Sequence, residues 1–211
     1  MNYPERFLSE TADIAKSIDL AQIEKMIAII ESVARKNGRI FFIGVGGSAA
    51  NCTHAVNDFR KLAGIECYAP VDNVAELTAR TNDEGWESVF SNWLKVSRLR
   101  ADDAIFVLSV GGGNAEKNVS VNIINAVKAA KEAGAKVIGI LGRDGGFTGK
   151  NADACVIIPT QSPDTITPHA EGWQGVIWHM LVSDPRILKM ANKWESIDKK
   201  ATFLHSPLPL E

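Results

Sequence analysis

The sequence has little cysteine, no marked excess of either charge and no long hydrophobic run. Its three cysteines, Cys52, Cys67 and Cys155, are widely spaced, so neither a disulfide framework nor a paired metal site is expected. The 23 basic and 25 acidic residues give a net charge of −2, which offers no electrostatic basis for binding nucleic acid or an anionic membrane. No stretch approaches the roughly 20 apolar residues that span a bilayer, and the amino terminus does not read as a signal peptide. These absences predict a cytoplasmic protein.

Glycine, by contrast, is concentrated where an apolar run meets a helical pattern. Residues 39–43, of mostly β-branched and aromatic type, lead into Gly44-Val45-Gly46-Gly47-Ser48, and helical spacing follows over residues 49–62. Glycines let the backbone approach an anion closely, and the free N–H groups at a helix start favour phosphate. A second glycine run, Gly111 to Gly113, follows another apolar segment that ends at Ser109.

Strand and helix patterns alternate along the chain. We expect strands at 39–43, 65–70, 103–109, 136–141 and 154–159, and helices within 5–36 (two), 49–62, 74–80, 86–96, 117–133 and 167–182, the last opened by Thr167 and Pro168. A polar turn is expected at 81–85 and a further helix near 186–194. This alternation predicts an α/β fold, with one doubly wound sheet of five parallel strands between two helical layers. Residues 1–182, including amino-terminal helices within 1–37, would form the domain, and 183–211 a carboxy-terminal extension.

The second helix, which begins near Asp19, is apolar over a broad arc of Ile23, Met26, Ile27, Ile29 and Ile30. Such a helix either packs on both sides within the domain or turns part of its arc toward another subunit. We favour the second interpretation, because the preceding helix also needs cover.

Three interpretations of the glycine loops stay open on residues alone. They could be ligand-free turns, or Gly44-x-Gly46-x-x-Ala49 could belong to a dinucleotide site. A dinucleotide site needs an acidic residue after the second strand, and Asp72 stands late for that role. Two loops, each with a serine at its edge (Ser48 and Ser109), suit a small phosphate ester better. No nucleotide cofactor is therefore expected.

The motifs taken in order resemble those of sugar isomerase (SIS) domains, and more closely those of the phosphoheptose isomerase branch. The resemblance spans about residues 1–182 and rests on Gly44 to Ser48, His54-x-x-x-Asp58, Asn82-Asp83-x-Gly85, Ser109 with its glycine loop, Gly142-x-Asp144-Gly145-Gly146 and Thr167-Pro168. It implies a flavodoxin-like three-layer fold and an aldose–ketose isomerase that acts on sedoheptulose 7-phosphate through an enediol.

The resemblance also implies a set of residues that bind the substrate and its phosphate. They are Gly46, Gly47, Ser48, Asn51, Asn82, Asp83, Ser109, Gly111, Gly112, Gly113, Asn114 and Glu171. The family has several hydroxyl residues in the loop after the third strand, in a Ser-Thr-Ser-Gly-Asn-Ser pattern, whereas only Ser109 remains here. The backbone N–H groups of the triple glycine would then carry more of the phosphate.

For catalysis the resemblance points to Asp58 and His179. Asp58 stands where the family has its catalytic glutamate, four residues after His54, and these two share a helix face. His179 lies eight residues after Glu171, which replaces a family glutamine; an unshifted alignment would put Trp178 there instead. We expect Asp58 to be the carbon base and His179 the ring-opening acid.

A divalent ion, with zinc the natural choice, would lie among His54, Asp58, Glu171 and His179. Glu171 and His179 are about 12 Å apart along a helix, so a shared ion is at the limit of their reach. The resemblance further implies a homotetramer with active sites between subunits. The rivals are a non-catalytic phosphosugar-binding module or assembly adaptor, which would not need Asp58 and His179, and a nucleotide-binding Rossmann enzyme.

Overall fold

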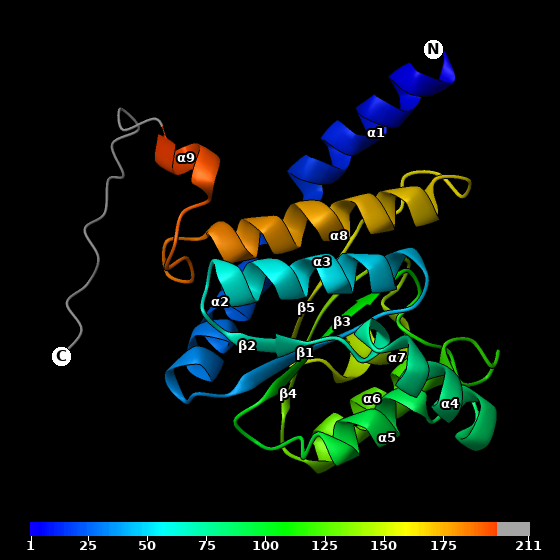
Figure 1. Cartoon of the computed structure of the whole chain (residues 1–211). Coiled ribbons are helices and arrows are strands. Elements are labelled where there is room, and N and C mark those ends of the chain that lie inside the picture. Colours follow the sequence, from blue (N-terminus) through cyan, green and yellow to red (C-terminus); the bar gives the residue numbers. More distant parts are fainter. Residues whose placement is uncertain (198–211) are drawn as a thin grey trace.

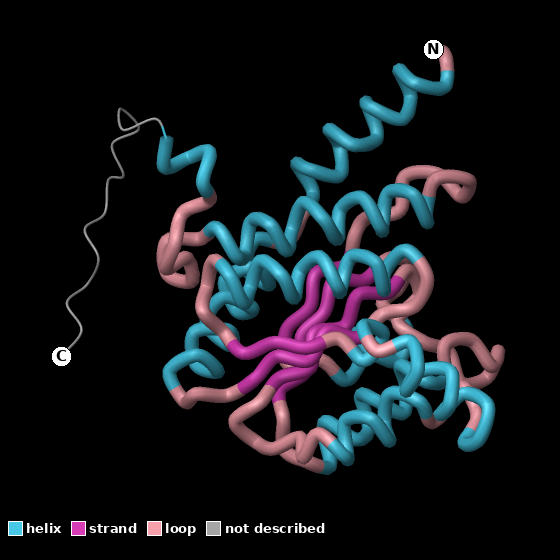
Figure 2. Tube along the Cα trace, in the orientation of Figure 1, coloured by secondary structure: helices cyan, strands magenta, loops and turns pink. Residues whose placement is uncertain are grey.

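A computed structural model describes residues 1–197 and confirms the predicted fold class. The strands gather in one sheet (Figure 2). Five parallel strands form it in the order β2-β1-β3-β4-β5. They are β1 (Arg39–Ile43), β2 (Glu66–Tyr68), β3 (Ala104–Ser109), β4 (Lys136–Leu141) and β5 (Ala154–Ile157). The strand order reverses between β1 and β3, and α/β sheets of this kind bind ligands at the carboxyl ends of the strands beside such a switch point.

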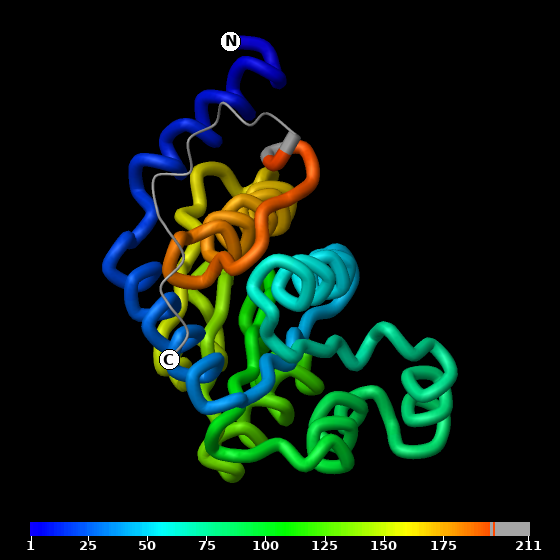
Figure 3. Tube along the Cα trace, turned by 60° about the vertical axis from the view of Figure 1, so that its left-hand side comes forward, coloured from blue at the N-terminus to red at the C-terminus, as the bar shows by residue number. Residues whose placement is uncertain are grey.

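Helices cover both faces of the sheet (Figures 1 and 3). One face carries α2 (Leu20–Arg35), α3 (Gly47–Lys61) and α8 (Ile166–Ser183), and the other carries α5 (Val89–Val96), α6 (Val121–Glu132) and α7 (Gly146–Asn151). The remaining helices are α1 (Tyr3–Ser17), the 3₁₀ turn η1 (Pro70–Asp72), α4 (Val74–Glu84) and α9 (Lys193–Ile197). Within residues 1–197, no helix combines the length and apolarity needed to cross a membrane.

Each central strand serves two cores, because successive side chains on a strand point to opposite faces. In β1, Ile40 and Phe42 pack with α2, α3 and α8, whereas Phe41 and Ile43 pack with α5 and α6. β3 alternates in the same way, and all of its residues are buried. This is why both strands are almost wholly apolar in the sequence.

The segment around Asn82 and Asp83 differs from the prediction. Instead of a polar turn at 81–85, α4 continues through Glu84. Arg80 pairs with Glu76 and with Glu84, one helical turn away on either side, and such i, i+4 pairs support an exposed helix. Gly85, with φ at 87°, ends α4, so α5 begins only at Val89 and not at residue 86.

Two other helix starts were also predicted wrongly. α6 begins at Val121 and not at residue 117, because Asn114 and Val119 exchange two backbone hydrogen bonds and close a tight turn before it. α8 begins at Ile166 with Thr165 as its N-cap. Thr167 and Pro168 therefore lie inside the first turn, where proline is still tolerated since that N–H has no intrahelical partner.

The apolar arc of α2 is covered within the chain, contrary to our prediction. Ile23, Met26, Ile27 and Ile30 are at most 4% exposed, in the same core as α3 and α8. α1 is covered on one side only, where Glu10 and Ile14 are buried. The helix extends away from the body (Figure 1) and exposes Tyr3 and Leu8 (56% and 68%). Any surface for a second subunit is thus better sought on α1 than on α2.

The predicted boundary after residue 182 falls within packed structure. Ile187 is buried in the same core as α8, and the N–H groups of Lys189 and Met190 donate to the carbonyl of Leu62. The helix expected near 186–194 is instead the short α9, which starts at Lys193. The rest of the predicted extension, 198–211, lies outside the described residues.

Candidate active site

The first glycine loop turns sharply from β1 into α3. Gly46 is the N-cap of α3 with φ at 65°, a conformation that favours glycine. A side chain on Gly44 would lie 2.7 Å from the carbonyl oxygen of Ser48. Ser48 is buried, and its Oγ accepts a 3.0 Å hydrogen bond from Nε2 of Gln174 on α8. The start of α3 is thereby fastened to α8.

Glu171 lies at this same loop. Asn51 Nδ2 donates to the Glu171 carbonyl and to Gln174 Oε1, each at 3.0 Å. A Cβ atom built on Gly47 would be 2.6 Å from Cδ of Glu171, so the carboxylate of Glu171 lies directly against Gly47. The negative charge is favourable beside the amino-terminal end of α3. The predicted four-residue metal site would require Glu171 to join His54, Asp58 and His179, but Glu171 is not part of that group.

The second loop uses much of its own backbone for structure. Ser109 Oγ accepts a 3.0 Å hydrogen bond from the N–H of Gly112. The Gly112 carbonyl accepts from the backbone N–H and the hydroxyl of Thr148, and the Gly113 carbonyl accepts from the N–H of Phe147. These bonds fasten the loop to α7. Within residues 1–197 the N–H groups of Gly111 and Gly113 have no acceptor, so they are the donors left for an anion.

Three predicted substrate residues take part in local contacts instead. Asn82 and Asp83 are exposed on α4, and Asn82 Nδ2 donates to Asp83 Oδ1 at 2.7 Å. Asn114 Oδ1 accepts from the N–H of Lys117 at 2.8 Å. In the described part of the chain, no hydrogen bond joins these side chains to either glycine loop.

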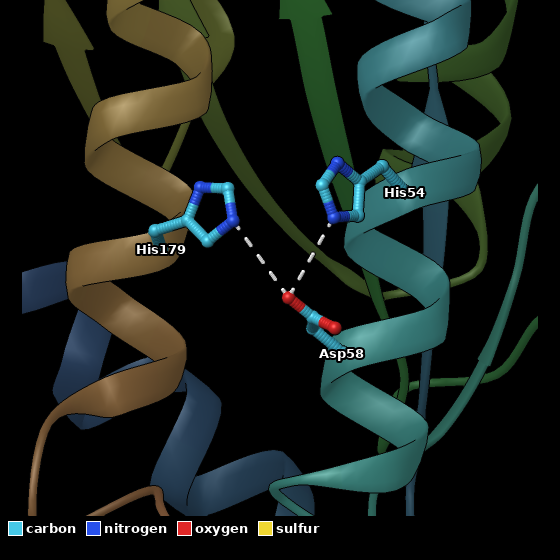
Figure 4. Close-up of side chains that lie close together, drawn as sticks. All are labelled: His54, Asp58 and His179. Carbon is cyan, nitrogen blue, oxygen red and sulfur yellow. Dashed lines mark ion pairs between the residues drawn. The ribbon is translucent and has the colours of Figure 1, made fainter. Parts of the chain in front are cut away.

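His54, Asp58 and His179 converge between α3 and α8 (Figure 4). Oδ2 of Asp58 is 3.9 Å from Nε2 of His54, one turn earlier on α3, and 3.8 Å from Nε2 of His179 on α8. The two imidazole rings lie edge to face with centroids 5.2 Å apart. About half of each histidine side chain is exposed, whereas Asp58 is only 14% exposed. A solvent-facing site with a partly shielded carboxylate results.

Hydrogen bonding defines the tautomer of His179. Its Nδ1 is 2.7 Å from the carbonyl oxygen of Gly175. A carbonyl can only accept, so Nδ1 carries the proton, and Nε2 of the neutral ring keeps its lone pair toward Asp58. Asp58 is held from its other oxygen, since Asn57 Nδ2 donates to Oδ1 at 2.7 Å.

The indole ring of Trp178 packs against both histidine rings. Its fully buried ring stacks on His179 with centroids 3.5 Å apart, and His54 meets it edge-on at 4.7 Å. The neighbour of His179 in the sequence therefore belongs to the core. The shifted alignment of α8 selects His179, which faces Asp58, whereas the unshifted alignment selects the buried Trp178.

The three side chains suit a divalent metal ion. One ligand atom from each lies within 4.8 Å of the others. Nitrogen and oxygen donors held about 2.0–2.2 Å from zinc in a tetrahedron are somewhat closer to one another than this, so small side-chain rotations would suffice. The Nδ1–H to carbonyl bond of His179 is also the outer contact that metal-binding histidines commonly make. The set consists of His54, Asp58 and His179, without Glu171.

Sequence reasoning missed two residues that hold this site together, Gln174 and Trp178. Gln174 is fully buried and joins Ser48 to Asn51. A signal for it existed, because a glutamine at a core-facing position of an otherwise apolar helix needs polar partners. Trp178 enters the sequence analysis only as the residue that an unshifted alignment selects, and nothing in the sequence indicates that its ring contacts two histidines.

Comparisons with known proteins identify the family of this chain. A model of the SIS domain family matches residues 6–142. The phosphoheptose isomerase of Aliarcobacter butzleri is 30% identical over 169 residues, 77% of this chain and 86% of that protein. That of Rhodospirillum rubrum is 29% identical over 75% of this chain and 81% of that protein. The solved structure of phosphoheptose isomerase GmhA from Neisseria gonorrhoeae gives a TM-score of 0.72 at 26% identity, covering 85% of this chain and 97% of that one.

The chain therefore belongs to the SIS domain family. This result confirms the predicted family and its phosphoheptose isomerase relatives.

Proposed function

We propose that the protein is a phosphosugar isomerase that interconverts an aldose and a ketose phosphate, with sedoheptulose 7-phosphate as its substrate. The observation that carries the proposal is the convergence of His54, Asp58 and His179, from two helices whose amino-terminal ends lie near the glycine loops. The substrate comes from the relatives, which are named phosphoheptose isomerases and cover most of the chain.

The chemistry follows from the protonation states available to the cluster. His179 Nε2 can take the proton of the anomeric hydroxyl and return it to the ring oxygen, which opens the sugar. The carbonyl of Gly175 stabilises the imidazolium formed in between, because it accepts from Nδ1 throughout. The carboxylate of Asp58 then removes the proton from the carbon next to the carbonyl and returns it to the former carbonyl carbon, so that the reaction passes through an enediol. Nε2 of His179 carries the proton of the neighbouring hydroxyl to the carbonyl oxygen, which completes the exchange.

We further propose that His54, Asp58 and His179 can hold a zinc ion. Because Nδ1 of His179 donates to the carbonyl of Gly175, zinc would bind the lone pair of Nε2. Proton transfer through His179 and zinc binding by His179 therefore belong to different states of the site. When bound, zinc would polarise the sugar carbonyl and its neighbouring hydroxyl. His54, which has no proton-transfer role in this scheme, would serve as a ligand. Ser48 and the second loop, with Gly111 and Gly113, would bind and orient the phosphorylated sugar.

The proposed assembly is a homotetramer with its active sites between subunits. Asp58 lies eleven residues after Gly47 on α3, or about 16 Å along the helix axis. A sugar held at the glycine loops is therefore far from the same chain's Asp58, and the loops of a second copy could come closer. The exposed side of α1 also supports assembly, because a second subunit could cover the apolar side chains of Tyr3 and Leu8 there. We place the protein in the cytoplasm, in keeping with its free cysteines.

Subunit mixing tests the shared site. One variant, Asp58→Asn, lacks the base, and the other, Gly111→Val, has a blocked loop; Gly111 is chosen because a Cβ there meets only Arg143 Cδ, at 3.9 Å. If sites are shared, mixed tetramers assayed at low substrate should regain about a quarter of wild-type activity, since a quarter of randomly formed sites combine two intact halves. Sites contained in one chain would regain none. Sedimentation should show a tetramer, and a monomer would contradict the assembly.

A non-catalytic phosphosugar-binding module is the rival, favoured by the loss of hydroxyl residues around Ser109 and by aspartate in place of glutamate at Asp58. NMR of the protein with a panel of ketose and aldose phosphates decides between the two. Isomerisation of sedoheptulose 7-phosphate supports the enzyme. Binding without turnover, with zinc present and measured in the sample, supports the module.

A further inference from the structure

The second glycine loop has few side-chain donors of its own, yet it lies beside an arginine that the proposed mechanism does not use. Arg143 follows β4, which is hydrogen-bonded to β3 along its length. The N–H of Gly142 donates to the carbonyl of Ser109 at 3.1 Å, so the turn after β4 and the loop after β3 leave the sheet side by side. A Cβ atom built on Gly111 would lie 3.9 Å from Cδ of Arg143. The arginine side chain thus passes along the open side of Gly111.

The backbone of Arg143 is held in an uncommon conformation. Its φ is 52°, in the left-handed region that non-glycine residues seldom adopt. In residues 1–197, four other non-glycine residues share this region, and only one of them, Arg98, is also a long side chain. Glycine would satisfy the turn at Arg143 without strain. Arg98 shares this conformation, so the case for a binding role rests on where the side chain of Arg143 lies, beside Gly111.

Arg143 is exposed, and within the described residues its guanidinium forms no hydrogen bond and no ion pair. The nearest acid in sequence, Asp144, is engaged, because its Oδ1 accepts the N–H of Gly146 at 3.1 Å. Two loop donors next to Arg143, the N–H groups of Gly111 and Gly113, also have no acceptor there. The hydroxyl oxygen of Ser109 accepts from the N–H of Gly112, which leaves the hydroxyl proton of Ser109 free to donate as well. A cation and two backbone donors therefore remain for an anion.

We propose that Arg143 is a substrate-binding residue that holds the phosphate group of the sugar, together with the backbone of Gly111 and Gly113. A phosphate monoester carries close to two negative charges at neutral pH, and a guanidinium binds its oxygens through paired N–H donors. Arg143 would replace the hydroxyl groups that the loop has lost after Ser109. This inference rests on the proposed function for the identity of the phosphorylated ligand.

The test measures binding of inorganic phosphate and of sedoheptulose 7-phosphate to the full chain by calorimetry. Arg143→Gln should weaken both by about 10- to 100-fold, the effect of losing charge-assisted hydrogen bonds, and Arg143→Lys should restore part of the loss. Arg143→Gly should lose the same affinity with no fall in unfolding temperature. In an isomerase assay, KM should rise far more than kcat falls.

Arg98→Gln is the matched control. Arg98 is also an exposed arginine with positive φ (53°). It precedes β3 and lies at the amino ends of the strands, whereas the glycine loops lie at their carboxyl ends. The Arg98→Gln variant should bind phosphate with the affinity of the wild type.

Equal affinity in Arg143→Gln and the wild type would overturn the inference, and so would a wild type that binds neither phosphate nor the sugar phosphate. Turnover is scored separately. Loss of phosphate binding in Arg143→Gln, in a protein that has no isomerase activity, would support this inference while rejecting the proposed reaction.

Discussion

Replacing Asp58 by asparagine is the sharpest test of the proposed chemistry. Asparagine keeps the size of the side chain, and its amide oxygen can still accept from Asn57 Nδ2, as Oδ1 of Asp58 does at 2.7 Å. It cannot take up a proton at any ordinary pH. The fold should therefore survive while the proposed carbon base is lost.

The expected loss in kcat is about 10²- to 10⁴-fold, the usual contribution of a general base. This corresponds to about 3–5 kcal/mol of transition-state stabilisation, at 1.36 kcal/mol for each factor of ten. The substrate KM should change little, because the phosphate is bound at the glycine loops. Bound zinc should also fall, since Oδ2 of Asp58 lies between the two histidines, 3.8 and 3.9 Å from their Nε2 atoms.

The assay combines steady-state kinetics with metal analysis by mass spectrometry on the same samples. His179→Gln should behave like Asp58→Asn, and Asp58→Glu should remain active, because the resembled family has glutamate at this position. Asp102→Asn is the control, an exposed aspartate that pairs with Lys36 at 3.6 Å, far from the cluster. Turnover in both Asp58→Asn and His179→Gln within a few fold of wild type would refute the mechanism.

Three further predictions concern the structure around the site. Glu10 accepts from Ser162 and Thr165 and pairs with His169 at 2.9 Å; these contacts, the Ser162 hydroxyl first, lower its pKa. The stability that the Glu10 carboxylate contributes is therefore complete above the ordinary pKa of 4.5 and is lost as pH falls through the lowered pKa. Glu10→Gln should lower Tm at pH 7, and the difference in Tm between variant and wild type should shrink in acid. A Tm difference that stays constant with pH would contradict this. Trp178→Ala should cost about 3–5 kcal/mol in urea unfolding, and Trp178→Phe clearly less, because the buried indole Nε1 has no partner in residues 1–197; equal costs would contradict the packing described. Gly112→Val should unfold the protein, since its Cβ would overlap the carbonyl of Gly145, whereas Gly111→Val should fold and only weaken phosphate binding, as circular dichroism and calorimetry would show.

Local patterns were enough to predict the fold. The apolar runs that became β1 and β3 are buried on both faces, which is typical of a parallel sheet covered by helices, and their alternation with helical patterns favoured that fold. The capping residue Asp19 also marked the start of α2 correctly, because its side chain accepts from the N–H groups of Ala21 and Gln22. These signals lie within a few residues of the structure they specify.

Helix boundaries near the site were less predictable, because longer contacts decide them. Asn82 and Asp83 resemble a turn by residue type, yet Arg80 holds that segment as a helix through Glu76 and Glu84. The apolar arc of α2 suggested a subunit contact, and only the packing of α3 and α8 revealed that the same core covers it.

The sequence alone placed His54, Asp58, Glu171 and His179 on two helices, and it determined the four- and eight-residue spacings between them. Which of the four meet depended on how α3 and α8 lie against each other. The contact between Ser48 and Gln174 ties the amino-terminal end of α3 to the middle of α8. This brings Glu171 to Gly47 and leaves His179, two turns further along α8 than Glu171, beside Asp58. A helix repeats every 3.6 residues, so sequence spacing defines a face, but only the tertiary structure determines what that face meets.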